Sequence, residues 1–158
     1  MIRNASEQDL PALAAGMMRL QQLHVDAFPN IYKPFSEPDA ISYLTDILSR
    51  PEFHVRVAVH SGQLAGHAVL AVESTESNMF KHAQQFGHIT QIEVDPKFRR
   101  RGIGRQILDD TAELSLQLGL NRILLDVWAF NGAGLNFFLA GRYKPFGSKL
   151  VRMVGSVG

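Results

Sequence analysis

The sequence contains no cysteine. This absence excludes disulfides, thiolate metal sites and a cysteine nucleophile, and it fits a reducing compartment. The chain also lacks any apolar run close to the ~20 residues that cross a bilayer. Its start, Met1 to Asn4, has no apolar core of a signal peptide. We therefore expect a soluble protein of the cytoplasm.

The sequence also has little excess charge. Its 16 Lys and Arg residues against 15 Asp and Glu give a net charge of +1, so no global field attracts nucleic acid or a membrane. The six histidines show neither i, i+4 pairs nor a carboxylate triad, and we expect no bound metal. No linker or repeat is visible in 158 residues, which predicts a single domain over residues 1–158.

Hydrophobic periodicity predicts an α+β domain, layered around a mixed sheet. Helical spacing and cap residues predict helices at about 7–23, from Ser36 to near Pro51, at 103–118 and at 132–140. Ser6 with Asp9 and Ser36 with Asp39 are the predicted N-terminal signals, Gly119 is a predicted left-handed cap, and Asn131 is the predicted cap of the last helix. Alternating or wholly apolar runs predict strands at 1–4, 53–59, 64–73, 88–94, 122–128, 143–146 and 150–154. The turn Ser61-Gly62-Gln63 predicts a hairpin between the second and third of these strands, and the polar segment 74–84 is a predicted loop. The low polarity of residues 122–128 is typical of a strand in parallel pairing.

The segment from Lys97 to Arg105 is the most informative one. It holds five of the 16 basic residues, and Gly102 and Gly104 interrupt them. A predicted strand precedes it and an amphipathic helix follows. Glycine lets the backbone approach a ligand closely, and the first N–H groups and dipole of a helix attract anions. This context predicts a phosphate site to which the arginines add forked donors.

Other interpretations of this basic segment are a solvated turn and a nucleic-acid patch. The second has no other basic stretch or aromatic platform to support it. A P-loop is excluded, because Arg105 and Gln106 follow Gly104 where Lys and Ser or Thr are needed. A Rossmann turn is excluded by Ile107 and by the distance from Val94 to Gly102, which is too long for the tight turn.

The segment from Gln91 to Leu108 resembles the signature segment of the GNAT family of N-acetyltransferases, which carries Gln/Arg-x-x-Gly-x-Gly/Ala. Arg99, Gly102 and Gly104 match that pattern, and the preceding Val-Asp-Pro also fits. The later Leu-Asp-Val-Trp, Asn131 and the pair Phe137-Phe138 resemble the second conserved block. The resemblance implies a GNAT-like, mostly antiparallel central sheet flanked by helices, with central strands that splay apart.

The resemblance also implies a reaction. An acetyl group moves from acetyl-CoA, the co-substrate, to a primary amine that attacks the thioester directly. Backbone groups of Ile92 and Val94 would pair with the pantetheine arm, and N–H groups from residue 100 to 105 would hold the pyrophosphate. The expected CoA-binding residues are Ile92, Val94, Arg99, Arg100, Arg101, Gly102, Ile103, Gly104, Arg105 and Asn131.

The catalytic candidates are less sharply defined. His88 and Glu93 are candidates for the base that keeps the amine neutral. By strand alternation Glu93 should point away from the face of Ile92 and Val94 unless a bulge intervenes, whereas His88 has the parity of Val94 and should share its face. Phe138 stands where the family often has a tyrosine that protonates the thiolate, so Tyr143 is the candidate acid. A catalytically weak CoA sensor is the alternative function.

The acceptor is expected to be a small-molecule or peptide amine. Its site would be lined by His24, Phe28, Tyr32 and Trp128, although the aromatic residues could instead pack the first two helices together. Neither nucleic acid nor a membrane is expected as a partner. Exposed sheet edges make a homodimer plausible.

Overall fold

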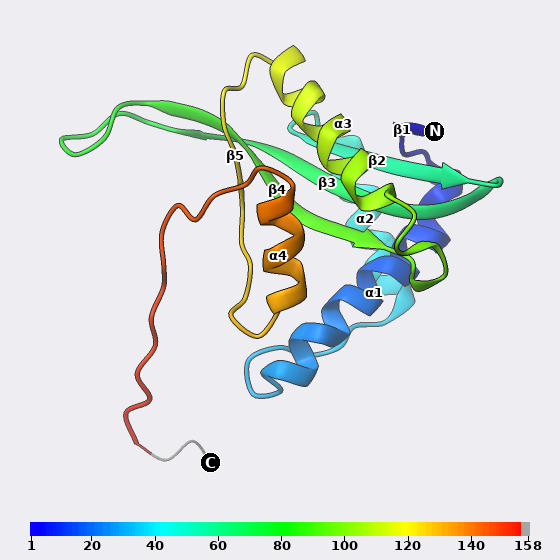
Figure 1. Cartoon of the computed structure of the whole chain (residues 1–158), viewed down its shortest axis with the longest axis horizontal. Coiled ribbons are helices and arrows are strands. Elements are labelled where there is room, and N and C mark those ends of the chain that lie inside the picture. Colours follow the sequence, from blue (N-terminus) through cyan, green and yellow to red (C-terminus); the bar gives the residue numbers. More distant parts are fainter. Residues whose placement is uncertain (156–158) are drawn as a thin grey trace. The chain divides into compact units, whose positions relative to one another are not determined.

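The computed structural model describes residues 1–155, and these residues form two compact units, 1–126 and 127–155 (Figure 1). The first unit contains β1 (Ile2–Asn4), α1 (Leu10–Ala27), α2 (Glu37–Ser49), β2 (Phe53–His60), β3 (Gln63–Thr75), β4 (Gln84–Val94), α3 (Ile103–Gln117) and β5 (Ile123–Leu125). One-turn 3-10 helices precede α1 and follow β4, at Glu7–Asp9 and Pro96–Phe98. The predicted α+β class is confirmed.

The sheet has the order β1-β2-β3-β4-β5. Its first three pairings are antiparallel, whereas β4 and β5 are parallel, as the apolar character of residues 122–128 predicts. The parallel pairing joins only Gly87–Ile89 to Ile123–Leu125, and beyond Ile89 the strand β4 pairs only with β3 among the described residues. The sheet is therefore open along the last five residues of β4 on the side of β5.

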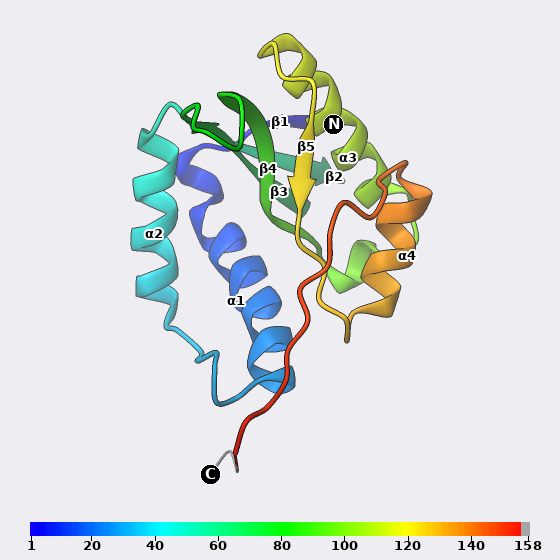
Figure 2. The same cartoon turned by 90° about the vertical axis from the view of Figure 1, so that its left-hand side faces the viewer.

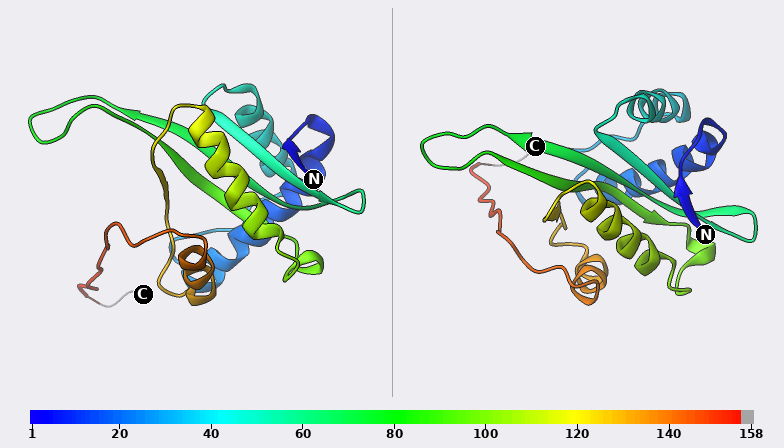
Figure 3. Two further views of the ribbon diagram at one scale, coloured as in Figure 1. Left: turned by 45° about the horizontal axis from the view of Figure 1, so that its top comes forward. Right: turned by 90° about the horizontal axis from the view of Figure 1, so that it is seen from above.

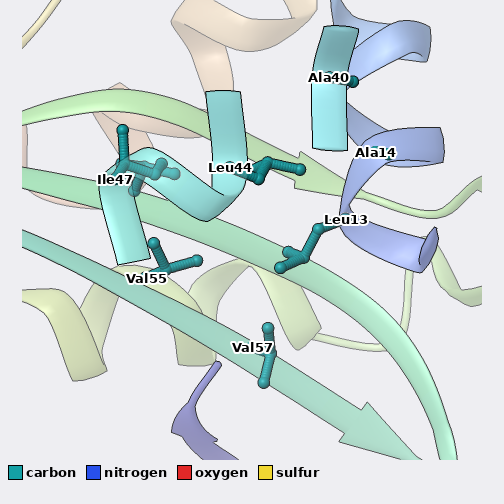
Figure 4. Close-up of a cluster of buried hydrophobic side chains, with 8 residues drawn as sticks. Leu13, Ala14, Ala40, Leu44, Ile47, Val55 and Val57 are labelled. Carbon is teal, nitrogen blue, oxygen red and sulfur yellow. The ribbon is translucent and has the colours of Figure 1, made fainter. Parts of the chain in front are cut away.

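The helices α1 and α2 cover one face of the sheet, and α3 covers the other (Figures 2 and 3). Both N-terminal signals are confirmed, since Ser6 with Asp9 and Ser36 with Asp39 form capping boxes. Leu13 of α1 and Leu44 of α2 pack onto Val57 of β2 in the larger buried cluster (Figure 4).

The helix α3 lies close to the opposite face. Its residues Ile103 and Ile107 pack on small side chains of the strands, among them Ala65 and Ala68. Gly66 allows this approach, because a Cβ there would lie 3.1 Å from Ile107 Cδ1 and 2.7 Å from the carbonyl oxygen of Glu93. The helix that begins at the basic loop is thus fixed to the strands that precede it.

The second unit contains α4 (Gly132–Ala140). Its predicted cap is confirmed, because the Asn131 side chain accepts the Gly134 N–H at 2.9 Å. The prediction of strands at 143–146 and 150–154 is wrong, since neither segment is a strand. Pro145 and Gly147 disfavour regular strand structure there, and alternation alone does not supply a pairing partner.

Two strand boundaries also differ from the expected ones. The strand predicted at 122–128 is only three residues long, because its pairing with β4 stops at Leu125. The strand predicted at 88–94 begins at Gln84, because β3 extends to Thr75 and the long β3–β4 hairpin continues into the polar segment (Figure 1). Over the described residues, no helix combines the length and apolarity needed to span a membrane.

Candidate functional site

The backbone of β4 is open where β5 has ended. The Asp95 N–H donates to the Ala65 carbonyl of β3 at 2.9 Å. Because peptide groups alternate in direction along a strand, those of Ile92 and Val94 point away from β3, toward the side that β5 has left. These are the two residues predicted to pair with an extended ligand.

A short structured turn connects this open edge to α3. Asp95 accepts the Lys97 N–H at 2.9 Å and begins the 3-10 helix Pro96–Phe98. The Arg99 Nε then donates to the Val94 carbonyl at 3.0 Å. Arg99 therefore ties the loop to the strand end, in addition to its predicted contribution to phosphate binding.

Two left-handed residues shape the basic loop. Arg100 has φ 61° and Gly102, the residue before α3, has φ 76°. In the described part of the chain, the N–H groups from Arg100 to Gly104 have no protein acceptor. Together with the dipole of α3, these N–H groups form a concentrated donor site for an anion.

The side chains of the loop divide between protein contacts and solvent. The Arg101 guanidinium lies 6.0 Å from the centre of the Phe98 ring, and Arg105 pairs with Asp109 one turn along α3. Arg100 and Arg101 are exposed at the surface of the loop. The residues 99–105, which the sequence predicts to bind CoA, thus lie together in the turn before α3 and in the first residues of that helix.

A β-bulge changes the orientation of His88. Val69 of β3 faces Gln91, but the next residue, Leu70, faces Ile89, so Thr90 is the extra residue in β4. His88 therefore lies on the α1–α2 face with Glu93, and the expectation that it shares the face of Val94 is wrong.

The His88 imidazole lies between two carboxylates. Its Nδ1 is 2.5 Å from Glu73 Oε1, and its Nε2 is 3.3 Å from Asp126 Oδ2. The side chain of His88 is 25% exposed. Asp126 directly follows β5, so these three side chains mark the place where the pairing of β4 with β5 ends.

Glu93, the other base candidate, is bound by an arginine that the sequence did not single out. Arg19 of α1 donates from Nε and Nη2 to the two oxygens of Glu93, at 3.0 and 3.2 Å. Its Nη2 also lies 3.4 Å from Asp95 Oδ2. These contacts raise the pKa of Arg19. Because 74 positions separate Arg19 from Glu93, no local pattern could have revealed the pair.

A buried histidine lies beside this ion pair. His67 of β3 is fully buried, and burial lowers its pKa to about 4. Gln91 lies beside the ring and offsets part of the lowering of the His67 pKa. Among the described residues, however, neither the Gln91 side-chain oxygen nor the ring nitrogens of His67 form a hydrogen bond of good geometry. Gly16 of α1 lies directly against the side chains of Glu93 and His67, because a Cβ there would be 2.9 Å from His67 Cε1 and 3.0 Å from Glu93 Oε2.

Three of the residues predicted to line the acceptor site lie together. The His24 and Tyr32 rings are 5.2 Å apart, and Phe28 is 6.5 Å from Tyr32. The fourth, Trp128, belongs to the second unit and stacks on Phe130. In that unit the Tyr143 ring lies edge-on to Phe138 at 5.9 Å, beside the position where the family's tyrosine was expected.

Comparisons with known proteins agree with this architecture. A model of the acetyltransferase (GNAT) family matches residues 17–141. A glucosamine 6-phosphate N-acetyltransferase from Trypanosoma brucei brucei is 26% identical over 88 residues, or 54% of this chain and 58% of that protein. The matching region thus spans little more than half of that relative's length.

Two solved structures illustrate the shared fold. A variant of the BH1408 protein from Bacillus halodurans has a TM-score of 0.92 at 20% identity, over 98% of this chain and 99% of that one. The aminoglycoside N-acetyltransferase AAC(6')-Iy, in complex with CoA, has a TM-score of 0.78 at 16% identity, over 98% and 93% of the two chains. At these identities the likeness establishes the fold.

Proposed function

Because the chain belongs to the acetyltransferase (GNAT) family, we propose that it transfers an acetyl group from acetyl-CoA to a primary amine. The amine nitrogen attacks the thioester carbonyl, a C–N bond forms, the C–S bond breaks, and CoA leaves as the thiolate. The family model extends across residue 126, which supports a single functional domain over residues 1–158.

The observation that carries this proposal is the row of N–H groups from Arg100 to Gly104 at the end of an open strand. A pyrophosphate would accept from these groups, and Arg100 and Arg101 would supply charge. The pantetheine arm would then lie along Ile92 and Val94, like an added strand. The Val94 N–H would stabilise the oxyanion that develops during attack.

The proton of the amine needs an acceptor, because alkyl ammonium groups have pKa values near ~10 in water. We assign this role to His88 acting through water. His88 precedes Val94, the proposed oxyanion donor, by six positions, or roughly 20 Å of strand, which is too far for direct transfer. Glu93 is the second candidate, although both of its oxygens accept from Arg19. Tyr143, beside Phe138, would protonate the thiolate.

The acceptor is proposed to be a small-molecule or peptide amine that contacts the cluster of His24, Phe28 and Tyr32. A named relative acetylates glucosamine 6-phosphate and another is an aminoglycoside acetyltransferase, so amino sugars are the first acceptors to test. A cytoplasmic location and a homodimer stay predictions, which cell fractionation and light scattering test.

Calorimetry with acetyl-CoA tests the first step of the proposal. We expect one binding site per chain. Titration of a double-stranded DNA fragment is the control for the basic loop, and it should give no comparable heat. Absence of acetyl-CoA binding by the folded protein would refute the proposed function.

Thiol release across a panel of amines tests the transfer itself. The panel should include amino sugars, aminoglycosides, polyamines and peptides, with the matching alcohols or N-acetylated amines as controls. We expect at least one amine to release CoA thiol in a stoichiometric amount. Acetyl-CoA binding without release by any amine would favour a sensor instead.

A further inference from the structure

We propose that Arg19 is a positioning residue for acetyl-CoA: by holding Glu93 and Asp95 it fixes the end of β4 and the start of the phosphate-binding loop. This inference rests on the proposed function, because it assumes that acetyl-CoA binds along β4 and at residues 100–104. Over the described residues, the hydrogen bonds and ion pairs of Arg19 go to Glu93 and Asp95, and none goes to Ile92, Val94 or residues 100–104.

The contacts of Arg19 enclose one residue of the open strand. Glu93 and Asp95 flank Val94, whose carbonyl is held by Arg99. The last two residues of β4 and the residue directly after the strand are therefore held by arginine side chains. Because the Val94 N–H is the proposed oxyanion donor, a small displacement of this strand end would change both cofactor binding and catalysis.

The same guanidinium controls the position of the loop. Asp95 contacts Arg19 and also accepts the Lys97 N–H, which begins the 3-10 turn toward Arg99. A planar fork suits two carboxylates at once, whereas a lysine ammonium is a single point of charge. Arg19 thus connects α1 directly to the turn that presents the N–H groups of the loop.

Charge gives a second reason for the arginine. Glu93 is 5% exposed and Asp95 is 20% exposed at the side chain, so the two carboxylates are poorly screened by solvent. They lie immediately before a loop that is proposed to bind a pyrophosphate. Without Arg19, two uncompensated negative charges would oppose the bound anion.

The packing of α1 brings Arg19 to this position. Gly16 precedes Arg19 by three residues and so lies on the same helix face. Its missing side chain lets α1 approach His67 and Glu93 closely. The first helix, which also carries His24, is therefore connected to the cofactor loop through a partly buried polar contact.

The test compares Arg19→Met and Arg19→Lys with wild type by calorimetry with acetyl-CoA. The control is Arg56→Met, which breaks the Arg56–Asp110 ion pair on the opposite face, where the two side chains are 16% and 21% exposed. Urea unfolding of each variant separates lost affinity from lost stability. The lysine variant keeps the charge and covers the case in which Arg19→Met does not fold.

We expect Arg19→Met to weaken acetyl-CoA binding by about tenfold or more, Arg19→Lys by a smaller factor, and Arg56→Met not at all. Equal affinities of wild type and both Arg19 variants would overturn this inference and leave the proposed function intact. Equal weakening by Arg56→Met would also overturn it, by showing a general loss of stability. Failure of wild type to bind acetyl-CoA would refute the proposed function itself.

Discussion

Acidification is expected to destabilise the protein through His67. This side chain is fully buried, and its pKa falls from 6.5 to about 4 in the folded state. The unfolded chain therefore binds a proton between these two values that the folded chain does not bind. Stability is complete above pH 6.5 and declines as the pH falls toward about 4.

The size of the effect follows from the shift. Each unit of pKa difference corresponds to about 1.4 kcal/mol, so a shift from 6.5 to about 4 gives about 3 kcal/mol. Desolvation of the charged ring is the main cause, and the nearby Arg19 guanidinium opposes protonation further. Asp9, whose pKa is lowered to about 2 by Arg3, acts in a separate and more acidic window.

Urea unfolding at a series of pH values measures this effect. Wild type should be compared with His67→Gln, in which a neutral side chain of similar size replaces the imidazole. The difference between the two unfolding free energies removes contributions common to both, such as that of the partly buried His54, whose pKa is also lowered. Parallel pH profiles for the two proteins, or an imidazole signal of His67 that titrates near pH 6.5, would refute the reasoning.

Three substitutions test the packing and the loop. Gly16→Ala should lower the unfolding free energy by about 1–2 kcal/mol, because the added Cβ would lie 2.9 Å from His67 Cε1 and this clash outweighs the gain in helix propensity. The control Gly132→Ala, with open space around the added Cβ, should not lower it. Equal unfolding free energies of wild type and Gly16→Ala in chemical unfolding would contradict the close contact. Gly102→Asp should abolish acetyl-CoA binding in calorimetry and keep the fold. The control Gly119→Asp, at a residue with a similar φ of 75° at the other end of α3, should retain the affinity for acetyl-CoA. Retained affinity in both variants would show that the loop does not belong to the binding site. Asn131→Ala should lower the unfolding free energy by about 1 kcal/mol through loss of the α4 cap, and Asn131→Ser should recover most of that stability in thermal unfolding. An alanine variant as stable as wild type would show that the cap does not stabilise the protein.

Local chemistry determined much of the fold before any tertiary contact was known. The capping boxes at Ser6 and Ser36 are confirmed, as is the left-handed Gly119 after α3. The β2–β3 hairpin and the strand–loop–helix at the basic segment are confirmed as well. Each of these features depends on residues within one or two turns of each other, so the sequence pattern contains the information.

Pairing between strands decided what alternation could not. The bulge at Thr90 arises from the fit of β4 to β3, and it turns His88 to the face of Glu93. The early end of β5 at Leu125 likewise depends on its partner, because an apolar run does not specify how many residues pair. That early end is what opens the backbone of Ile92 and Val94.

The sequence by itself determined the phosphate-binding character of residues 99–104, because glycine, arginine and a helix start are local properties. Only the tertiary structure decided which side chains surround that loop. Arg19 meets Glu93 and Asp95 from a distant helix, and His67 is buried beneath Gly16. Such contacts depend on how closely a helix packs on a sheet, and a packing distance between remote segments leaves no periodic mark in a single sequence.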